Sequence, residues 1–383
     1  MFCVGTVYAL TVLQTELSRL LGVSEPWSVV PFGAACLGLC VGVSTCASLM
    51  TQRSVHLVAA WGTMLWGFAV AIAGAFLSKG SFVWILFSLL LGGIGVGWTY
   101  LAVVVLVGRA FPNHMLARSA IGPMGFSSGT AACIALGSVF DFTSLDAKSL
   151  GTGLTLAGST FIMVAAVTMI SLHIEEDIKR KSPSFLKAKS ESEVFFSTLL
   201  FFNALPGMVI FDALLPFASY HTQGMENDPL KFLPYAMIAL FSGGLLAPSL
   251  NSILGPKITF AGLFSLRGFS LVLLSQFSNT NVSISGLLLC LFGHGAGFSI
   301  IPSLIKAKQE HPASFPSSYG RVLVNWGIAG VVGCILNGVL GASFGNSATV
   351  GLVIGVISLS FSAALYILPS FGDASLMCFE RNI

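Results

Sequence analysis

The stretch Phe82–Val107, FVWILFSLLLGGIGVGWTYLAVVVLV, contains no charged residue and is long enough to cross a bilayer as a helix. It is typical of the chain, which is 55% hydrophobic and only 9% charged. An ordinary soluble domain carries about 25% charged residues. The 18 Lys and Arg and 15 Asp and Glu cannot cover the surface of a soluble protein of 383 residues. Composition therefore excludes a soluble enzyme, a disordered chain and a nucleic-acid-binding protein, and it indicates a membrane protein with many spans.

Similar apolar runs recur along the chain between short polar breaks. A membrane-spanning helix needs about 20 mostly apolar residues. The sequence therefore predicts an all-α integral membrane protein of about twelve transmembrane helices, at Met1–Gln14, Trp27–Met50, His56–Leu77, Phe82–Val107, Ser119–Phe140, Gly153–Ile174, Val194–Tyr220, Phe232–Leu254, Ile258–Phe277, Ser283–Ile305, Tyr319–Ala342 and Thr349–Pro369.

The longest hydrophilic stretch, Glu175–Glu193, falls near the middle of the chain and has mixed charge. It divides the predicted helices six and six. We therefore expect an N-terminal six-helix half at residues 1–174, a cytoplasmic linker at 175–193 and a C-terminal six-helix half at 194–383.

Basic residues are unevenly divided between alternate loops. One set of loops holds Arg53, Arg109, Arg118, the five basic residues of the central stretch, Lys257, Lys306, Lys308 and Arg321. The other set holds Arg19, Lys79, Lys148 and Lys231. Because cytoplasmic loops carry the excess of Lys and Arg, both termini are predicted to face the cytoplasm. The sequence contains no retention or lipidation signal that identifies the membrane.

Two glycine runs suggest that the halves are related. Gly93-Ile94-Gly95-Val96-Gly97 and Gly293-His294-Gly295-Ala296-Gly297 lie 200 positions apart, each in the fourth predicted helix of its half. A dinucleotide-binding loop would need a preceding strand, and none is predicted. Close helix packing explains the glycines better. Two parallel six-helix halves describe a transporter of the major facilitator type.

The first half resembles the oxalate:formate antiporter family and its monocarboxylate-transporter relatives. The resemblance rests on Gly5–Leu10, on Gly92–Tyr100 and most specifically on Phe111–Arg118 with Pro123–Gly129. In the second half, Tyr319-Gly320 is similar to the family's Y-G. The resemblance implies that the first, fourth, seventh and tenth helices line a central cavity.

The sequence departs from that family in two places. The loop after the second helix, Ser48–Arg53, lacks the family's Asp, so gating should differ. The family's oxalate exchanger binds its dianionic substrate with basic residues in helices eight and eleven. Here Phe232–Leu254 has no Lys or Arg, and Arg321 lies only at the entrance of helix eleven. A monoanion or a more neutral solute therefore fits better than oxalate.

Three ionisable residues fall at membrane depth, where they are costly and mark candidate functional sites. His294 could exchange a proton near neutral pH and hold a carboxylate, or it could simply be satisfied by a helix carbonyl. Asp212 could accept a proton or pair with a cation, unless it lies near the outer surface. Arg267 could bind a carboxylate, although a structural contact with a carbonyl or carboxylate is the stronger reading.

Uncharged polar residues are further candidates for a substrate path. They could donate hydrogen bonds to a carboxylate, or they could serve only as contacts between helices. These residues are Tyr8, Thr11, Gln14, Tyr100, Ser127, Asn203, Asn325 and Trp326.

The sequence thus predicts a monomeric secondary transporter that moves a small organic anion, in particular a monocarboxylate, by alternating access. Proton symport through His294 and Asp212 is one hypothesis; anion exchange and a non-transporting sensor or scaffold are alternatives. Membrane lipid and the substrate are the expected partners. We expect no cofactor, since there is no ATP-binding loop, and the eight Cys form no C-x-x-C metal motif. No nucleophile elbow indicates an enzyme.

Overall fold

The computed structural model describes most of the chain. Descriptions below refer to residues 1–112, 114, 117–118, 120–140, 145–171, 191–212, 233–276, 280–309, 311–341 and 347–367. The side chain of Asp212, whose backbone ends a helix, lies outside the described set, as does most of the predicted linker. The predicted linker boundaries therefore remain predictions.

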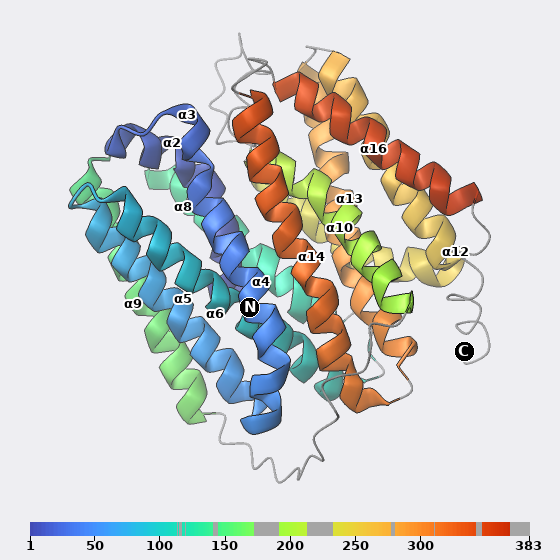
Figure 1. The fold of residues 1–383 in the computed structure, drawn as a ribbon, viewed down its shortest axis with the longest axis horizontal. Helices are drawn as coiled ribbons and strands as arrows, with labels where there is room; N and C mark the ends of the chain where they lie inside the picture. Colours follow the sequence, from blue (N-terminus) through green and yellow to red (C-terminus); the bar gives the residue numbers. More distant parts are fainter. Residues whose placement is uncertain are drawn as a thin grey trace.

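Helices dominate the described residues (Figure 1). In the first part of the chain they are α1 (Phe2–Gly5), η1 (Thr6–Ala9), α2 (Leu10–Leu21), α3 (Glu25–Ser28), α4 (Val30–Gln52), α5 (Val55–Leu77), α6 (Phe82–Ala110), η2 (Ala120–Met124), α8 (Gly125–Phe140) and α9 (Ala147–Ser171). In the second part they are α10 (Glu191–Asp212), α12 (Leu233–Gln276), α13 (Thr280–Ala307), η5 (Pro312–Ser314), α14 (Phe315–Leu336), η6 (Asn337–Gly341) and α16 (Ser347–Ile367).

These helices make twelve passes, as the sequence predicts. Among the described residues, nine helices are long and apolar enough to span a membrane. The α12 helix makes two of the passes, because Gly255 has φ 74° and ψ 159° and interrupts it before Pro256. Only glycine adopts this backbone conformation readily. Two further passes, at residues 2–21 and 120–140, are each built from consecutive helical pieces.

The ends of two helices differ from the predicted ones. The first helix was expected to stop at Gln14, yet it continues to Leu21. Glu16 forms an ion pair with Arg19 one turn later (2.7 Å), and Gly22, at φ 64°, ends the helix. The α9 helix begins before the expected Gly153, because the Asp146 carboxylate accepts a hydrogen bond from the Ser149 amide (2.8 Å). Local polar contacts thus extend both helices past the apolar runs.

The two parts of the chain form two groups of helices that meet along a seam. Figure 1 shows the early helices, in blue to green, at the left and the late helices, in yellow to red, at the right. The α6 helix packs on α4 and α5, while α12 packs on α13 and α16. Across the seam, α4 lies against α14 and α8 against α12.

The first glycine run is a packing device. A side chain at Gly93, Gly95 or Gly97 would collide with the backbone of α4 or α5. Close approach of backbones is what small residues allow between membrane helices.

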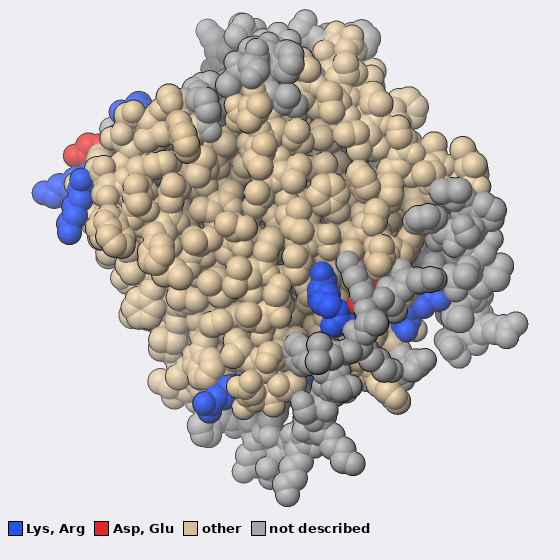
Figure 2. Space-filling model, viewed as in Figure 1, with Lys and Arg blue, Asp and Glu red and all other residues tan. Residues whose placement is uncertain are grey.

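The outer surface suits lipid. The face in Figure 2 is mostly uncharged, with the described Lys and Arg side chains confined to its upper left and lower parts. Large apolar side chains such as Val83 and Ile170 are more than 70% exposed. The chain is therefore a multi-pass integral membrane protein.

Candidate functional site

A small cavity lies where helices from both halves meet. Its volume is about 20 Å³, room for about one water molecule. Its wall is mainly aromatic and comes from η1, α6, η2, α8, α12, α13 and α14. The lining residues are Tyr8, Tyr100, Pro123, Met124, Phe126, Ser127, Leu240, His294, Gly295, Phe298 and Trp326.

Tyr8 is the polar centre of this cavity. Its hydroxyl accepts a hydrogen bond from the Trp326 Nε1 (3.0 Å) and lies 3.5 Å from the His294 Nε2. Its ring stacks on Phe211 at a centroid distance of 4.5 Å. Since Tyr8 belongs to the first half and its three partners to the second, these contacts join the halves at the cavity.

Arg267 lies behind His294, inside the second half. It is fully buried and donates hydrogen bonds to the Asn203 carbonyl oxygen (2.6 Å) and side-chain Oδ1 (3.0 Å). The Cys290 thiol lies beside its guanidinium. A cation facing lipid would be very unfavourable, and these oxygens replace part of its hydration.

Glycines make the space for these side chains. A Cβ at Gly293 would overlap the Arg267 stem, and one at Gly297 would overlap the Asn203 amide. On the opposite helix, a Cβ at Gly207 would overlap the His294 ring. The second glycine run therefore differs from the first, because it accommodates polar side chains as well as backbone.

The described side chains give this region a positive charge. Among the described side chains, no carboxylate lies within ion-pair distance of Arg267. Three nearby polar atoms, Arg267 Nε, Asn203 Nδ2 and His294 Nδ1, are buried and make no hydrogen bond of good geometry to described residues. The Asn203 backbone lies beside the His294 ring, and the Cys290 thiol lies beside the Arg267 guanidinium. Buried polar atoms of this kind are candidates to bind a water molecule or a ligand.

The structure brings some predicted site residues together and separates others. Tyr8, Tyr100, Ser127, His294 and Trp326 line the cavity, although the Ser127 hydroxyl donates to its own helix. Arg267 and Asn203 form a second layer behind it. The remaining described candidates, Thr11, Gln14 and Asn325, do not line it.

Two of those three remaining side chains are accounted for by contacts within their own helix. Thr11 donates to the Tyr8 carbonyl (2.7 Å), and Asn325 donates to the Val322 carbonyl (3.1 Å). The η1 turn at residues 6–9 departs from α-helical geometry, so the even spacing of Tyr8, Thr11 and Gln14 does not place them on one cavity-lining face. The prediction for Asp212 concerns a side chain outside the described residues.

Sequence reasoning missed the aromatic wall. Phe126, Phe211 and Phe298 surround Tyr8, His294 and Trp326. Phe298 follows His294 by four positions, so helical spacing could have placed both on one face. No comparable signal marks Phe211, because the chain contains 31 phenylalanines and nothing in the sequence distinguishes this one.

Comparison with solved structures agrees with this architecture. The E. coli fucose:proton symporter FucP, solved as a point variant, aligns with a TM-score of 0.64 and 14% identity over 95% of this chain and 97% of that chain. The nucleoside transporter NupG aligns with a TM-score of 0.64 and 15% identity, over 96% of this chain and 98% of that chain. This chain has the major facilitator fold. At such low identity, the likeness concerns the fold alone.

Sequence comparisons add no closer relative. No family profile matches the chain, and no curated protein does either. The resemblance to the oxalate:formate antiporter family is therefore not supported by these comparisons and remains a prediction.

Proposed function

We propose that this protein is a secondary transporter that moves a small organic monoanion by alternating access. The observation that carries the proposal is the polar cluster at the seam. Tyr8, His294 and Trp326 meet in an aromatic cavity, and Arg267 lies directly behind with no carboxylate partner among the described side chains. An aromatic pocket with a few convergent polar groups is the usual form of a small-molecule site.

Charge favours an anion of low valence. Since no carboxylate pairs with Arg267 among the described side chains, this cation makes the region attractive to negative charge. None of the lining residues is Lys or Arg, and His294 is the one basic residue among them. One permanent cation in the second layer suits one carboxylate better than two.

Alternating access follows from the size of the cavity. A volume of about 20 Å³ cannot hold an organic anion, so the cavity must widen before such a solute can bind. Because the wall comes from both halves, rocking of one half against the other would enlarge the cavity and open it to one side.

His294 offers a route to proton coupling. A proton on His294 would lie close to the Arg267 cation, and like charges repel. A bound carboxylate would relieve this repulsion, so anion and proton would each favour binding of the other. Symport of the anion with a proton is therefore the mode of coupling that we propose.

The first test is a thermal-shift screen of the purified protein. The ligands are acetate, lactate and pyruvate as monoanions, oxalate and succinate as dianions, and fucose and uridine as neutral solutes. A ligand that binds the folded state raises the melting temperature. We expect the largest rise with a monoanion. A rise with fucose or uridine alone would replace the anion proposal by a neutral solute, which the aromatic wall would also accommodate.

The second test is uptake of the best ligand into proteoliposomes. An inward proton gradient should accelerate uptake, and His294→Gln should abolish the acceleration. Asp212→Asn, made in parallel, tests the other predicted proton acceptor. Equal counterflow with and without the gradient would favour anion exchange instead. No uptake of any ligand would favour a sensor or scaffold with a transporter fold.

A further inference from the structure

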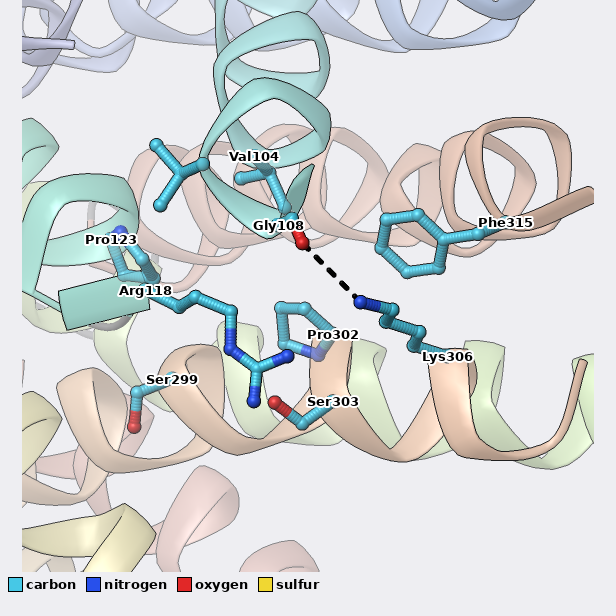
Figure 3. Close-up of a pocket in the computed structure, with 10 residues that line it drawn as sticks. Val104, Gly108, Arg118, Pro123, Ser299, Pro302, Ser303, Lys306 and Phe315 are labelled. Atoms are coloured by element: carbon cyan, nitrogen blue, oxygen red, sulfur yellow. Dashed lines mark hydrogen bonds between the residues drawn. The ribbon is translucent and has the colours of Figure 1, made fainter. Parts of the chain in front are cut away.

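A second pocket lies next to the central cavity, at the end of the molecule where α6 and α13 finish (Figure 3). Its volume is about 40 Å³, larger than the roughly 10–15 Å³ that one water requires. Among the described residues, its wall contains two cations and two hydroxyls and no carboxylate. The lining residues are Val104, Val107, Gly108, Arg118, Pro123, Ser299, Pro302, Ser303, Lys306 and Phe315.

The two cations come from different halves of the molecule. Arg118 immediately precedes the helix of η2 and α8, and Lys306 lies in the last turn of α13. Figure 3 shows both side chains extending into the space between α6 and α13. Among described atoms, the one hydrogen bond of the Lys306 amine goes to the Gly108 carbonyl of the other half (3.4 Å). This long, neutral contact uses one of the three donors of the ammonium.

Arg118 is less well satisfied. Its Nε is buried and has no hydrogen-bond partner among the described residues. Burial lowers the pKa of its guanidinium, because removal from water disfavours the charged form. An arginine nevertheless stays protonated in proteins. The pocket therefore holds two like charges that repel each other across the seam.

The pocket continues the path from the central cavity. Pro123 lines both spaces. Along α13, His294 and Phe298 face the cavity, and Ser299, Ser303 and Lys306 face the pocket on the following turns. Figure 3 shows the Ser303 hydroxyl pointing toward the Arg118 guanidinium. A solute that leaves the central cavity toward this end would meet the pocket next.

We propose that the pocket is an anion-binding site, in which a small monoanion bridges Arg118 and Lys306 and holds the two halves together at this end. The anion neutralises the repulsion between the cations and accepts hydrogen bonds from both. Without it, repulsion favours separation of the halves. The site takes a carboxylate or a halide of similar size, because its volume excludes larger organic anions. It is distinct from the central cavity and does not depend on the transport proposed above.

Binding is tested with formate and chloride as probes. The purified protein is titrated with each at constant ionic strength, with gluconate as the bulky balancing anion. A saturable rise in melting temperature is expected. Formate without chloride would identify the ligand as a carboxylate, and both together would identify any small monoanion. No saturable rise with either probe overturns the proposal.

Variants then locate the site. Arg118→Gln and Lys306→Gln should each weaken the response at least about tenfold, since each removes a charge-assisted hydrogen bond to the anion. Lys308→Gln removes the same charge just beyond the end of α13, outside the pocket lining, and should leave the response unchanged. Equal weakening in Lys308→Gln would refute the assignment.

Occupancy is read directly from a cysteine in the pocket. A membrane-impermeant maleimide should label Ser303→Cys when the two halves separate at this end. The unsubstituted protein measures the background labelling of the native thiols. Formate should slow this labelling, and it should fail to do so when Arg118→Gln is added. Protection that survives Arg118→Gln would contradict the bridging role. The two readouts remain informative even if the protein transports nothing.

Discussion

Tyr8 is the residue on which the central cavity depends most. One hydroxyl accepts from Trp326 and lies against His294, so a single side chain of the first half organises two of the second. Its buried hydroxyl matters because a buried donor left without an acceptor carries a penalty of about 1–3 kcal/mol. Arg267 has a similar role in the second layer. Its planar guanidinium donates to both the carbonyl oxygen and the side-chain oxygen of Asn203.

The Tyr8 contacts predict a non-additive mutant cycle. Tyr8→Phe should lower the apparent melting temperature, since it leaves the indole N–H of Trp326 without its acceptor. Trp326→Phe should cost less in that background than in the wild type, because the partners are then removed together. Thermal unfolding of the two single variants and the double variant measures this. Tyr366→Phe, at a side chain 67% exposed, is the control. Strict additivity would mean that the hydrogen bond contributes nothing.

The two hydrogen bonds of the Arg267 guanidinium predict that a positive charge alone is not enough to keep the fold stable. Arg267→Lys keeps the positive charge but cannot donate to both Asn203 oxygens in the same geometry. The expected loss of stability is about 1–3 kcal/mol, seen as a lower melting temperature. Arg53→Lys, in an exposed loop position, should have little effect. If Arg267→Lys unfolds at the wild-type temperature, the contacts to Asn203 are not what makes the buried cation tolerable.

At the scale of elements, glycines decide how closely polar helices approach. The α10 and α13 helices meet at Gly207 and His294, and no side chain larger than hydrogen fits between them. The α12 helix uses a glycine differently, since the backbone at Gly255 turns one apolar stretch into two passes. This break falls between the two apolar runs that the sequence predicts as separate passes, Phe232–Leu254 and Ile258–Phe277.

The α10–α13 contact predicts a sharp difference between two glycine substitutions. Gly207→Ala should displace the His294 ring and reduce both melting temperature and uptake. Gly262→Ala, in α12, meets nothing within 4 Å, so it should be neutral or stabilising by up to about 1 kcal/mol. Thermal unfolding and uptake of the two variants check this. Equal behaviour of the pair would show that α13 can shift freely away from α10.

At the scale of the whole molecule, the proposed transport depends on the seam between the two groups of helices. The α4 and α14 helices pass side by side at its centre, and polar contacts cross it at the cavity and beside Lys306. The cavity is closed in this conformation, so any solute requires movement of one half relative to the other. A covalent link across the seam should therefore stop transport.

Gly33→Cys tests this with a native partner. A Cβ at Gly33 would lie 3.6 Å from the Cys334 Cβ on α14, within the range of about 3.5–4.5 Å found in disulfides. Oxidation should cross-link α4 to α14 and abolish uptake, and a reductant should restore it. The Gly33→Cys, Cys334→Ser variant should be unaffected by oxidation. Uptake that persists at full cross-linking would exclude rocking of the halves.

Sequence alone determined the membrane location, the all-helical class and the twelve passes, because hydropathy is a local property and bilayer thickness sets helix length. It also pointed to Tyr8, His294 and Trp326, since polar groups at membrane depth are rare and conspicuous. Only the tertiary structure decided which candidates meet. It placed Arg267 behind the cavity, left Thr11 and Asn325 bonded to their own helices, and brought Arg118 to Lys306 across the seam. Such proximity depends on helix rotation and packing between residues far apart in the chain, which a local pattern does not contain.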